Sequence, residues 1–112
     1  MNLEGKVGLV TGASRGIGRA CATKLASLGA RVAVNYHTRA SPPDEVVAAI
    51  KAGGGDATAV QGDVSQFAMA QHVVAATLST YGRLDILVNN AGTTRDALLA
   101  TMKEDDFDAI IQ

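Results

Sequence analysis

The chain has 112 residues, a length that suits one domain and leaves little room for two. Apolar residues make up 47% and charged residues 19%, which is ordinary for a globular protein and excludes a disordered or collagen-like chain. Ten basic against eleven acidic side chains give a net charge of -1, so no basic surface is available for nucleic acid or an anionic membrane.

The first half of the chain alternates short apolar runs with a helical pattern. Residues 7–10 are apolar without polar alternation, which predicts a strand buried on both faces. A helix is predicted next, because spacings of four, four and three place four apolar residues on one stripe: Ile17, Cys21, Leu25 and Leu28. Gly29 supplies its C-terminal cap. Residues 31–34 form the second predicted strand, and residues 35–43 a polar loop.

The second half repeats this alternation. Ser41 is a candidate N-cap, with a proline at the first position of a helix that ends at the glycines 53–55. Residues 57–61 and 84–88 are predicted strands. Between them, Ser65 is the expected N-cap of a helix that ends at Gly82 and has a buried stripe of Phe67, Ala70, Val74, Leu78 and Tyr81. Residues 93–101 are expected to form a loop or turn, and residues 104–112 to begin a further helix.

This order predicts an α/β fold, a doubly wound parallel sheet of about four strands covered by helices on both faces. Ligands of such sheets bind beyond the carboxyl ends of the strands, here at Val10, Val34, Gln61 and Val88. If the strands follow the order 3-2-1-4, residues 84–88 become an unpaired apolar edge, which favours association.

A glycine-rich segment, residues 11–18 with the sequence TGASRGIG, lies between the first strand and the first helix. Glycines at 12, 16 and 18 allow a sharp turn that presents backbone N–H groups at a helix N-terminus, a typical pyrophosphate site. The alternative is a tight turn with no ligand. A phosphate loop of the nucleoside-triphosphatase kind is excluded, because Gly18 is followed by Arg19 and Ala20 rather than by Lys and Ser or Thr.

This glycine pattern resembles the cofactor fingerprint of classical short-chain dehydrogenases/reductases. The sequence Asn-Asn-Ala-Gly at 89–92 and the pair Asp63-Val64 are similar to further hallmarks of that family. Residues 5–6, 11–19 and 94–99 look most like 3-oxoacyl-[acyl-carrier-protein] reductases. The resemblance spans the chain and implies a three-layer Rossmann-type fold. Residues 1–112 would be the N-terminal dinucleotide-binding part of one domain, truncated before the catalytic segment.

The resemblance implies a set of cofactor-binding residues: Gly12, Ser14, Arg15, Gly16, Ile17, Gly18, Asn35, His37, Asp63, Val64, Asn90, Ala91 and Gly92. In the family, the acid at Asp63 receives the adenine amino group and the 90–92 turn borders the ribose. Alternatively, Asp63 only caps the following helix, and Asn89 and Asn90 only accept the backbone angles of a turn. Asn89 is also a candidate to tie neighbouring strands together.

The end of the second strand indicates which cofactor is used. An NAD enzyme places Asp or Glu about 20 residues after the glycine loop, whereas this chain has Asn35 there and no nearer acid than Asp44. Arg15, with Ser14 and His37, could bind the 2′-phosphate of NADP through charge-assisted hydrogen bonds. Arg39 is a weaker candidate, and either arginine could instead face solvent. NADP is therefore the expected cofactor.

No residue can be nominated as catalytic. The family uses Tyr-x-x-x-Lys with a Ser and an Asn, but Tyr36 and Tyr81 are followed four residues later by Ala40 and Asp85. The resemblance implies NADP-dependent reduction of a 3-oxoacyl thioester on acyl carrier protein, or a related carbonyl, in fatty acid synthesis. The alternative is a truncated, non-catalytic nucleotide-binding module.

Other expectations concern partners and location. The complete protein is expected to form a homo-oligomer. Apolar runs of about five residues, against the roughly 20 of a membrane helix, indicate no membrane partner. A lone cysteine and the absence of a signal-peptide pattern favour the cytoplasm. Cys21 is expected in the core, and no metal site is predicted because His37 and His72 lack ligands at suitable spacing.

Overall fold

The computed structural model describes residues 2–13, 16–38 and 43–89 with their side chains, and residues 98–102 by their backbone. Within these residues the elements follow one another in the order β1 (Val7–Val10), α1 (Gly16–Ser27), β2 (Arg31–Tyr36), α2 (Asp44–Ala52), β3 (Ala57–Gln61), α3 (Phe67–Tyr81), β4 (Leu84–Asn89) and β5 (Leu98–Met102).

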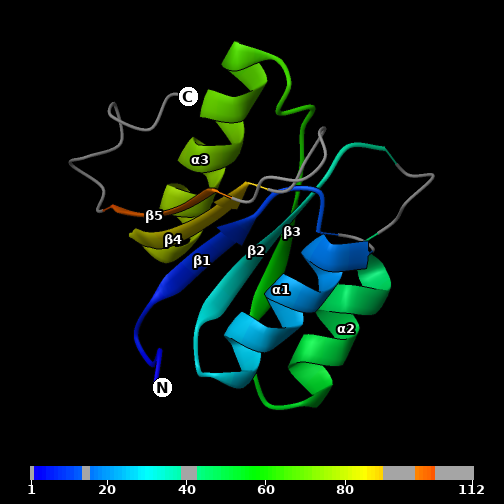
Figure 1. Cartoon of the computed structure of the whole chain (residues 1–112), viewed down its shortest axis with the longest axis vertical. Helices are drawn as coiled ribbons and strands as arrows, with labels where there is room; N and C mark the ends of the chain where they lie inside the picture. Colours follow the sequence, from blue (N-terminus) through cyan, green and yellow to red (C-terminus); the bar gives the residue numbers. More distant parts are fainter. Residues whose placement is uncertain (1, 14–15, 39–42, 90–97, 103–112) are drawn as a thin grey trace.

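The sheet has the strand order β3-β2-β1-β4-β5, and its first four strands are parallel (Figure 1). Val10 at the end of β1 is level with Val34 of β2 and with Val88 of β4. The carboxyl ends of these strands therefore meet at one edge of the sheet. The predicted doubly wound α/β fold with a four-stranded parallel sheet is confirmed.

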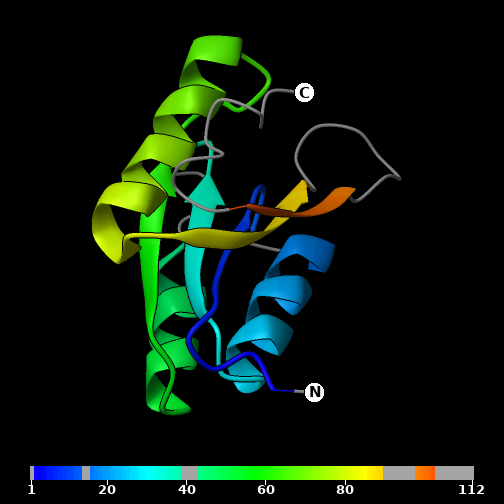
Figure 2. The same cartoon turned by 90° about the vertical axis from the view of Figure 1, so that its left-hand side faces the viewer.

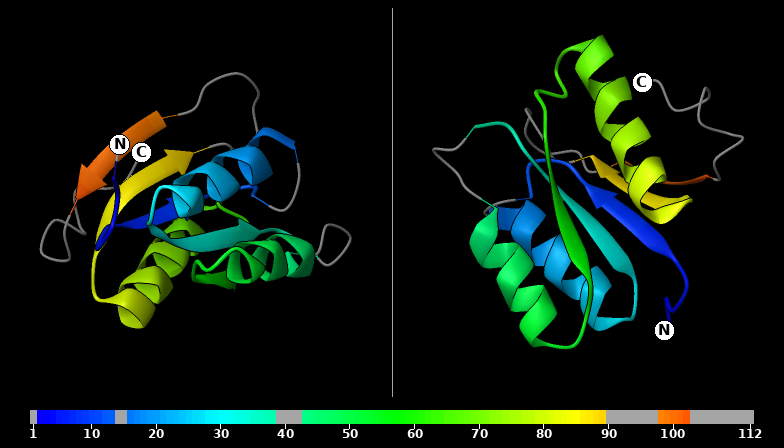
Figure 3. Two further views of the ribbon diagram at one scale, coloured as in Figure 1. Left: turned by 90° about the horizontal axis from the view of Figure 1, so that it is seen from below. Right: turned by 180° about the vertical axis from the view of Figure 1, so that it is seen from behind.

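The structure corrects the prediction for the other side of β4. Residues 98–101 were expected in a loop, but β5 pairs antiparallel with β4, with Val88 opposite Leu99 (Figure 3). The expectation that residues 84–88 form an unpaired edge is therefore wrong. The physical reason is chain length, because an antiparallel neighbour needs only a short connection, whereas a parallel strand needs a crossover of a dozen or more residues.

Helices cover the two faces of the parallel sheet unequally. Figure 2 shows α3 on one face, with α1 and α2 on the other. Neighbouring residues of β1 point to opposite faces, so Val10 packs with Ala22 and Val46 under α1 and α2, whereas Leu9 packs with Val73 and Leu78 under α3. The core is thus two thin layers of small aliphatic side chains, one on each side of the sheet.

Two predicted helix stripes are partly wrong. Ile17 is 70% exposed and Phe67 is 59% exposed, although each was expected to face the core. In α1 the buried residues are Gly18 and Ala22, whose small size lets the helix lie close to the sheet. In α3 the buried residues begin at Val73, so Phe67 lies in a first turn that precedes the buried part of the helix.

Element ends also differ from the prediction. β2 continues two residues further than expected, to Tyr36, and β4 continues to Asn89. α2 begins at Asp44, after both prolines, and Pro43 at its N-cap makes no side-chain cap bond. Ser41 lies outside the described residues. The C-terminal cap predicted at Gly82 is confirmed, with φ of 80° in the left-handed region.

Candidate functional site

The chain turns sharply between β1 and α1, at the carboxyl edge of the sheet (Figure 1). Gly12 has φ of 59° and Gly16 has φ of 65°, in the left-handed region where a side chain costs roughly 1–2 kcal/mol. A Cβ atom built on Gly16 would meet none of the described atoms within 4 Å. The predicted glycine turn is therefore formed at both of these positions, while Ser14 and Arg15 lie outside the described residues.

Thr11 joins the start of this turn to β4. Its N–H donates to the carbonyl oxygen of Val88 at 3.0 Å, and its Oγ1 donates to Asn89 Oδ1 at 3.0 Å. Asn89 therefore ties β1 to β4, one of the roles that the sequence allowed for it. Thr11 was missing from the predicted site residues. A hydroxyl between a buried strand and a glycine turn is the signal that could have identified it.

Asn35 lies directly beneath the glycine turn. Its side chain is 1% exposed, and its Oδ1 accepts a hydrogen bond from Gly12 N–H at 3.2 Å. Its Nδ2 donates to the carbonyl oxygens of Val60 and Gly62, at 3.1 Å each. The sequence placed Asn35 among the cofactor-contacting residues. In the structure its side chain instead contacts the protein backbone on both sides of β2.

The turn after β3 carries the predicted acid, Asp63. Its Oδ1 accepts hydrogen bonds from the Ser65 hydroxyl at 2.6 Å and from Ser65 N–H at 3.0 Å. These two bonds, with the charge of His37, hold the pKa of Asp63 below its ordinary value. Its Oδ2 lies 3.5 Å from His37 Nε2. Ser65 was predicted to cap α3 but does not, because the helix begins at Phe67. The Ser65 hydroxyl instead donates its hydrogen bond to Asp63.

His37 and Asp63 face solvent together, with 65% and 35% of their side chains exposed. Their contact lies where the ends of β2 and β3 are side by side. Val64, the neighbour of Asp63, is partly buried against the core layer under α3. One carboxylate oxygen of Asp63 thus accepts hydrogen bonds from Ser65, and the other lies near His37.

The first turn of α1 borders this region. Gly18 faces the sheet and is buried, whereas Ile17 is exposed. In any α-helix the first N–H groups have no acceptor within the helix, and the helix dipole places partial positive charge there. The predicted site residues Asn90, Ala91 and Gly92, like Arg39, lie outside the described residues. The structure thus brings together Gly12, Asn35, His37 and Asp63 at one edge.

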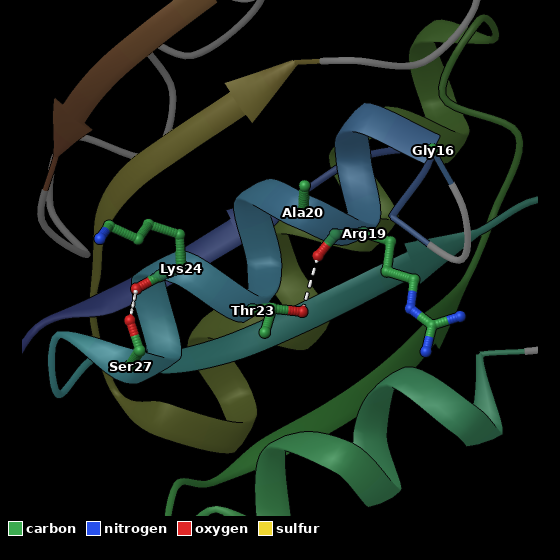
Figure 4. A pocket seen from close by; sticks show the side chains of 6 residues that line it. All are labelled: Gly16, Arg19, Ala20, Thr23, Lys24 and Ser27. Carbon is green, nitrogen blue, oxygen red and sulfur yellow. Dashed lines mark hydrogen bonds between the residues drawn. The ribbon is translucent and has the colours of Figure 1, made fainter.

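A shallow pocket of about 510 Å³ lies along the outer side of α1 (Figure 4). It is lined by Gly16, Arg19, Ala20, Thr23, Lys24 and Ser27. The hydroxyls of Thr23 and Ser27 donate to carbonyl oxygens of their own helix, and Arg19 pairs with Glu45 of α2 at 3.0 Å. Because these polar groups already have partners, the glycine turn is the better candidate site.

Cys21 is half-buried and packs against the core layer under α1 and α2. Among the described side chains, no three His, Cys, Asp or Glu residues lie together as a metal site would require. The described helices also include none that is long and apolar enough to cross a membrane.

The sequence model of the short chain dehydrogenase family matches residues 6–112. This chain belongs to the short-chain dehydrogenase family. It is 50% identical over 109 residues to a 3-oxoacyl-[acyl-carrier-protein] reductase from Synechocystis sp., a match that covers 97% of this chain and 44% of the relative. It is 48% identical over 106 residues to the 3-oxoacyl-[acyl-carrier-protein] reductase FabG from Staphylococcus aureus, covering 95% of this chain and 43% of the relative.

The fold is similar to that of a short chain dehydrogenase from Burkholderia cenocepacia J2315 solved in complex with NADP. The TM-score is 0.78 at 45% identity, over 97% of this chain and 44% of that chain. The chain therefore spans less than half the length of the short-chain dehydrogenases that it matches. The resemblance inferred from the glycine pattern and from residues 89–92 is confirmed.

Proposed function

We propose that residues 1–112 are the N-terminal, dinucleotide-binding part of an NADP-dependent oxidoreductase. Its reaction is hydride transfer from NADPH to a 3-oxoacyl thioester on acyl carrier protein, or to a related carbonyl, in fatty acid synthesis. The observation that carries this proposal is the glycine turn at Gly12 and Gly16, located at the carboxyl edge of a parallel sheet. Membership of the short-chain dehydrogenase family and the names of the two reductase relatives support it.

The described residues fit a dinucleotide. Glycines with positive φ bring the backbone close to a ligand, and the N-terminus of α1 favours an anion, so the pyrophosphate is assigned to residues 12–18. The adenine is assigned to Asp63 and Val64, and the ribose to the segment Asn90, Ala91 and Gly92. When bound, NADPH would supply the hydride, and the residues of this chain would hold and orient it.

Preference for NADP is inferred from charge. The exposed side chain just beyond the end of β2 is that of His37 rather than a carboxylate. The carboxylate beside His37 is that of Asp63, which accepts a hydrogen bond from the Ser65 hydroxyl. A 2′-phosphate would therefore meet His37 with the donors of Ser14 and Arg15, and Arg15 is assigned the main charge-assisted contact.

The test is titration of NADPH and NADH into the complete protein and into its Arg15→Ala variant. Loss of a charge-assisted phosphate contact is expected to weaken NADPH binding roughly 10- to 150-fold, with little change for NADH. An unchanged preference in the variant would remove Arg15 from the proposal.

Arg19→Ala is the matched control, because Arg19 lies four residues further along the sequence, within α1, and pairs with Glu45 of α2. It removes the same charge from a nearby position in the sequence without removing a proposed phosphate contact. Equal losses of NADPH affinity in both variants would indicate a general effect of charge and would contradict a specific contact at Arg15.

Chemistry is assigned to residues beyond Gln112 of the complete protein, because neither tyrosine of this chain suits a general acid. Tyr36 is 8% exposed and has no lysine four residues later. Burial, aided by Asp56, raises the pKa of Tyr81 to about 12, and Arg31 stacks on its ring at 5.3 Å. A reductase acid has to give up its proton readily to the developing alkoxide, so a raised pKa is the wrong direction.

These tyrosines support the second candidate, a non-catalytic nucleotide-binding module. An NADPH oxidation assay with a 3-oxoacyl thioester separates the two candidates when it compares residues 1–112 with the product of the extended reading frame. We expect turnover only from the extended product, which we place in the cytoplasm as a homo-oligomer. Turnover by residues 1–112 would contradict the assignment of chemistry to later residues, and an inactive extended product would favour the binding module.

A further inference from the structure

Asn35 is fully engaged inside the protein. Its side chain is 1% exposed, and each of its polar atoms has a backbone hydrogen-bond partner: Gly12 N–H for Oδ1, and the carbonyl oxygens of Val60 and Gly62 for Nδ2. Its own carbonyl oxygen also accepts from Ala13 N–H at 2.9 Å. This residue therefore contacts the glycine turn through both its side chain and its backbone.

These bonds join the two parts of the candidate site. Gly12 begins the turn assigned to the pyrophosphate, and Gly62 directly precedes Asp63, which is assigned to the adenine. Gly62 N–H also donates to the carbonyl oxygen of Tyr36 at 3.0 Å, which fixes the same junction from the neighbouring residue. The distance between the glycine turn and the exit of β3 is thus set through β2.

The position needs a primary amide. One oxygen has to accept from Gly12 N–H while two N–H groups serve two carbonyl oxygens, and only Asn offers both at this length. A carboxylate of the same shape would keep the acceptor but would face the oxygens of Val60 and Gly62 without a proton to share. It would also place a buried negative charge below a turn assigned to an anion.

We propose that Asn35 is a positioning residue of the nucleotide site, which orients the Gly12 amide and fixes the glycine turn relative to the β3 exit without touching the cofactor. Its neutrality keeps the turn able to receive an anion. This inference rests on the proposed function, because it takes the ligand to be a dinucleotide.

The test is Asn35→Asp in the complete protein, with dissociation constants measured for both NADPH and NADH well below the unfolding temperature. The variant would lose the orientation of the Gly12 amide and would add a negative charge below the turn. Both changes weaken binding of the pyrophosphate, which is common to the two cofactors. We therefore expect both affinities to fall by a similar factor, roughly 10- to 100-fold, with the NADPH to NADH ratio unchanged. A switch toward NADH would overturn the proposal, because it would show that residue 35 contacts the ribose.

Ile50→Ala separates positioning from stability. Ile50 is 4% exposed in α2 and packs in the core layer under that helix. This variant is expected to lower the unfolding temperature while leaving both dissociation constants unchanged. If Asn35→Asp behaves in the same way, Asn35 is only structural and the proposal fails.

Asn35→Ser keeps the test decisive if the aspartate variant does not fold. Serine is neutral and too short to bridge Gly12 and the two carbonyl oxygens, so a smaller but equal loss for both cofactors is expected. Wild-type affinities in a folded Asn35→Ser protein would overturn the proposal. If wild type binds neither dinucleotide, the proposed function fails, and that result is distinct from any effect of residue 35.

Discussion

At each end of the parallel strands, a backbone N–H donates a hydrogen bond to a buried side-chain oxygen. The carboxyl ends of the strands form the carboxyl edge of the sheet, and their amino ends form the opposite edge. At the carboxyl edge, Gly12 N–H donates to Asn35 Oδ1 at 3.2 Å. At the opposite edge, Val7 N–H donates to Asp85 Oδ2 at 2.9 Å. Asn35 is 1% exposed and Asp85 is 6% exposed, so both oxygens act inside the protein. The two arrangements differ in charge.

Asp85 is ionised and paired. Arg83 donates to it twice, from Nε to Oδ2 at 2.8 Å and from Nη2 to Oδ1 at 2.7 Å. Burial alone would raise the pKa of Asp85, but the bonds from Arg83 and Val7 N–H and the charges of Arg83 and Lys6 lower it below the ordinary value. At the edge with no assigned ligand, the acceptor for the backbone N–H can therefore be a carboxylate. At the edge assigned to an anion, the acceptor is a neutral amide.

The largest effect is expected at Gly16 on the carboxyl edge. Gly16→Val would strain a residue at φ of 65° and would direct its side chain into the space assigned to the pyrophosphate. We expect NADPH affinity to fall more than about 100-fold, because roughly 1–2 kcal/mol of backbone strain adds to the steric block. Titration of the folded variant, with its fold checked by circular dichroism, measures this effect.

Gly54→Val is the matched control for Gly16→Val. Gly54 has φ of 93°, its added Cβ would also meet no described atom within 4 Å, and it follows α2 at the opposite edge. Both variants introduce comparable backbone strain, so only Gly16→Val should lose binding. Loss of NADPH affinity in both would show that strain, rather than obstruction of the turn, is responsible.

A smaller effect, on stability, is expected at Gly62, the other end of the contacts made by Asn35. A Cβ atom at this position would lie 2.6 Å from Val73 Cγ2, and the fully buried, β-branched Val73 has few alternative rotamers. Gly62→Ala should therefore lower the free energy of unfolding by about 1–3 kcal/mol, measured by urea denaturation. It should also shift the carbonyl oxygen that Asn35 Nδ2 contacts.

Gly53→Ala provides the comparison at the opposite edge. Its nearest neighbour to an added Cβ is the carbonyl oxygen of Ala49 at 3.6 Å, an ordinary contact, and its φ of -83° suits any residue. We expect its free energy of unfolding to remain within about 0.5 kcal/mol of wild type. A Gly62→Ala protein as stable as Gly53→Ala would show that the β3 exit can move freely.

The alternation of apolar runs and helical spacing was enough to predict the four parallel strands, the three helices and the glycine turn. These features depend on residues close together in the sequence. Which helix residues face the sheet was harder to predict, as Ile17 and Phe67 show, because the stripe that packs is selected by contacts with distant strands. β5 could not be predicted either, since its pairing depends on which partner is available to β4.

The role of Asn35 shows the same limit within the candidate site. The sequence ended the second strand at Val34, so Asn35 was interpreted as a loop residue directed toward the ribose. Because β2 continues to Tyr36, Asn35 lies within the sheet and its amide reaches β3 on one side and the glycine turn on the other. His37 and Asp63, which lie beyond the strand ends, are next to each other, 3.5 Å apart.

The smallest effect is expected at the edge remote from the cofactor. Asp85→Asn keeps an oxygen for Val7 N–H but removes the charge that pairs with the half-buried Arg83, so at pH 7 we expect a loss of about 1 kcal/mol in the free energy of unfolding. The pKa of Asp85 is lowered in the folded protein, so the stability that its ionised form provides is present above the ordinary Asp pKa of about 3.9 and is lost as the pH falls through the folded pKa.

Urea denaturation of wild type and Asp85→Asn at a series of pH values, from pH 7 to well below the ordinary Asp pKa, measures this difference. The contributions of the other carboxylates cancel in the comparison. The two proteins should converge at the acid end, because a protonated Asp85 no longer attracts Arg83. NADPH affinity should be the same in both at pH 7, unlike in Asn35→Asp, since the same exchange of amide and carboxylate is made far from the proposed anion. A stability difference that does not shrink as the pH falls below the ordinary Asp pKa would show that Arg83 and Asp85 act through packing. A change in NADPH affinity would remove the distinction between the two edges.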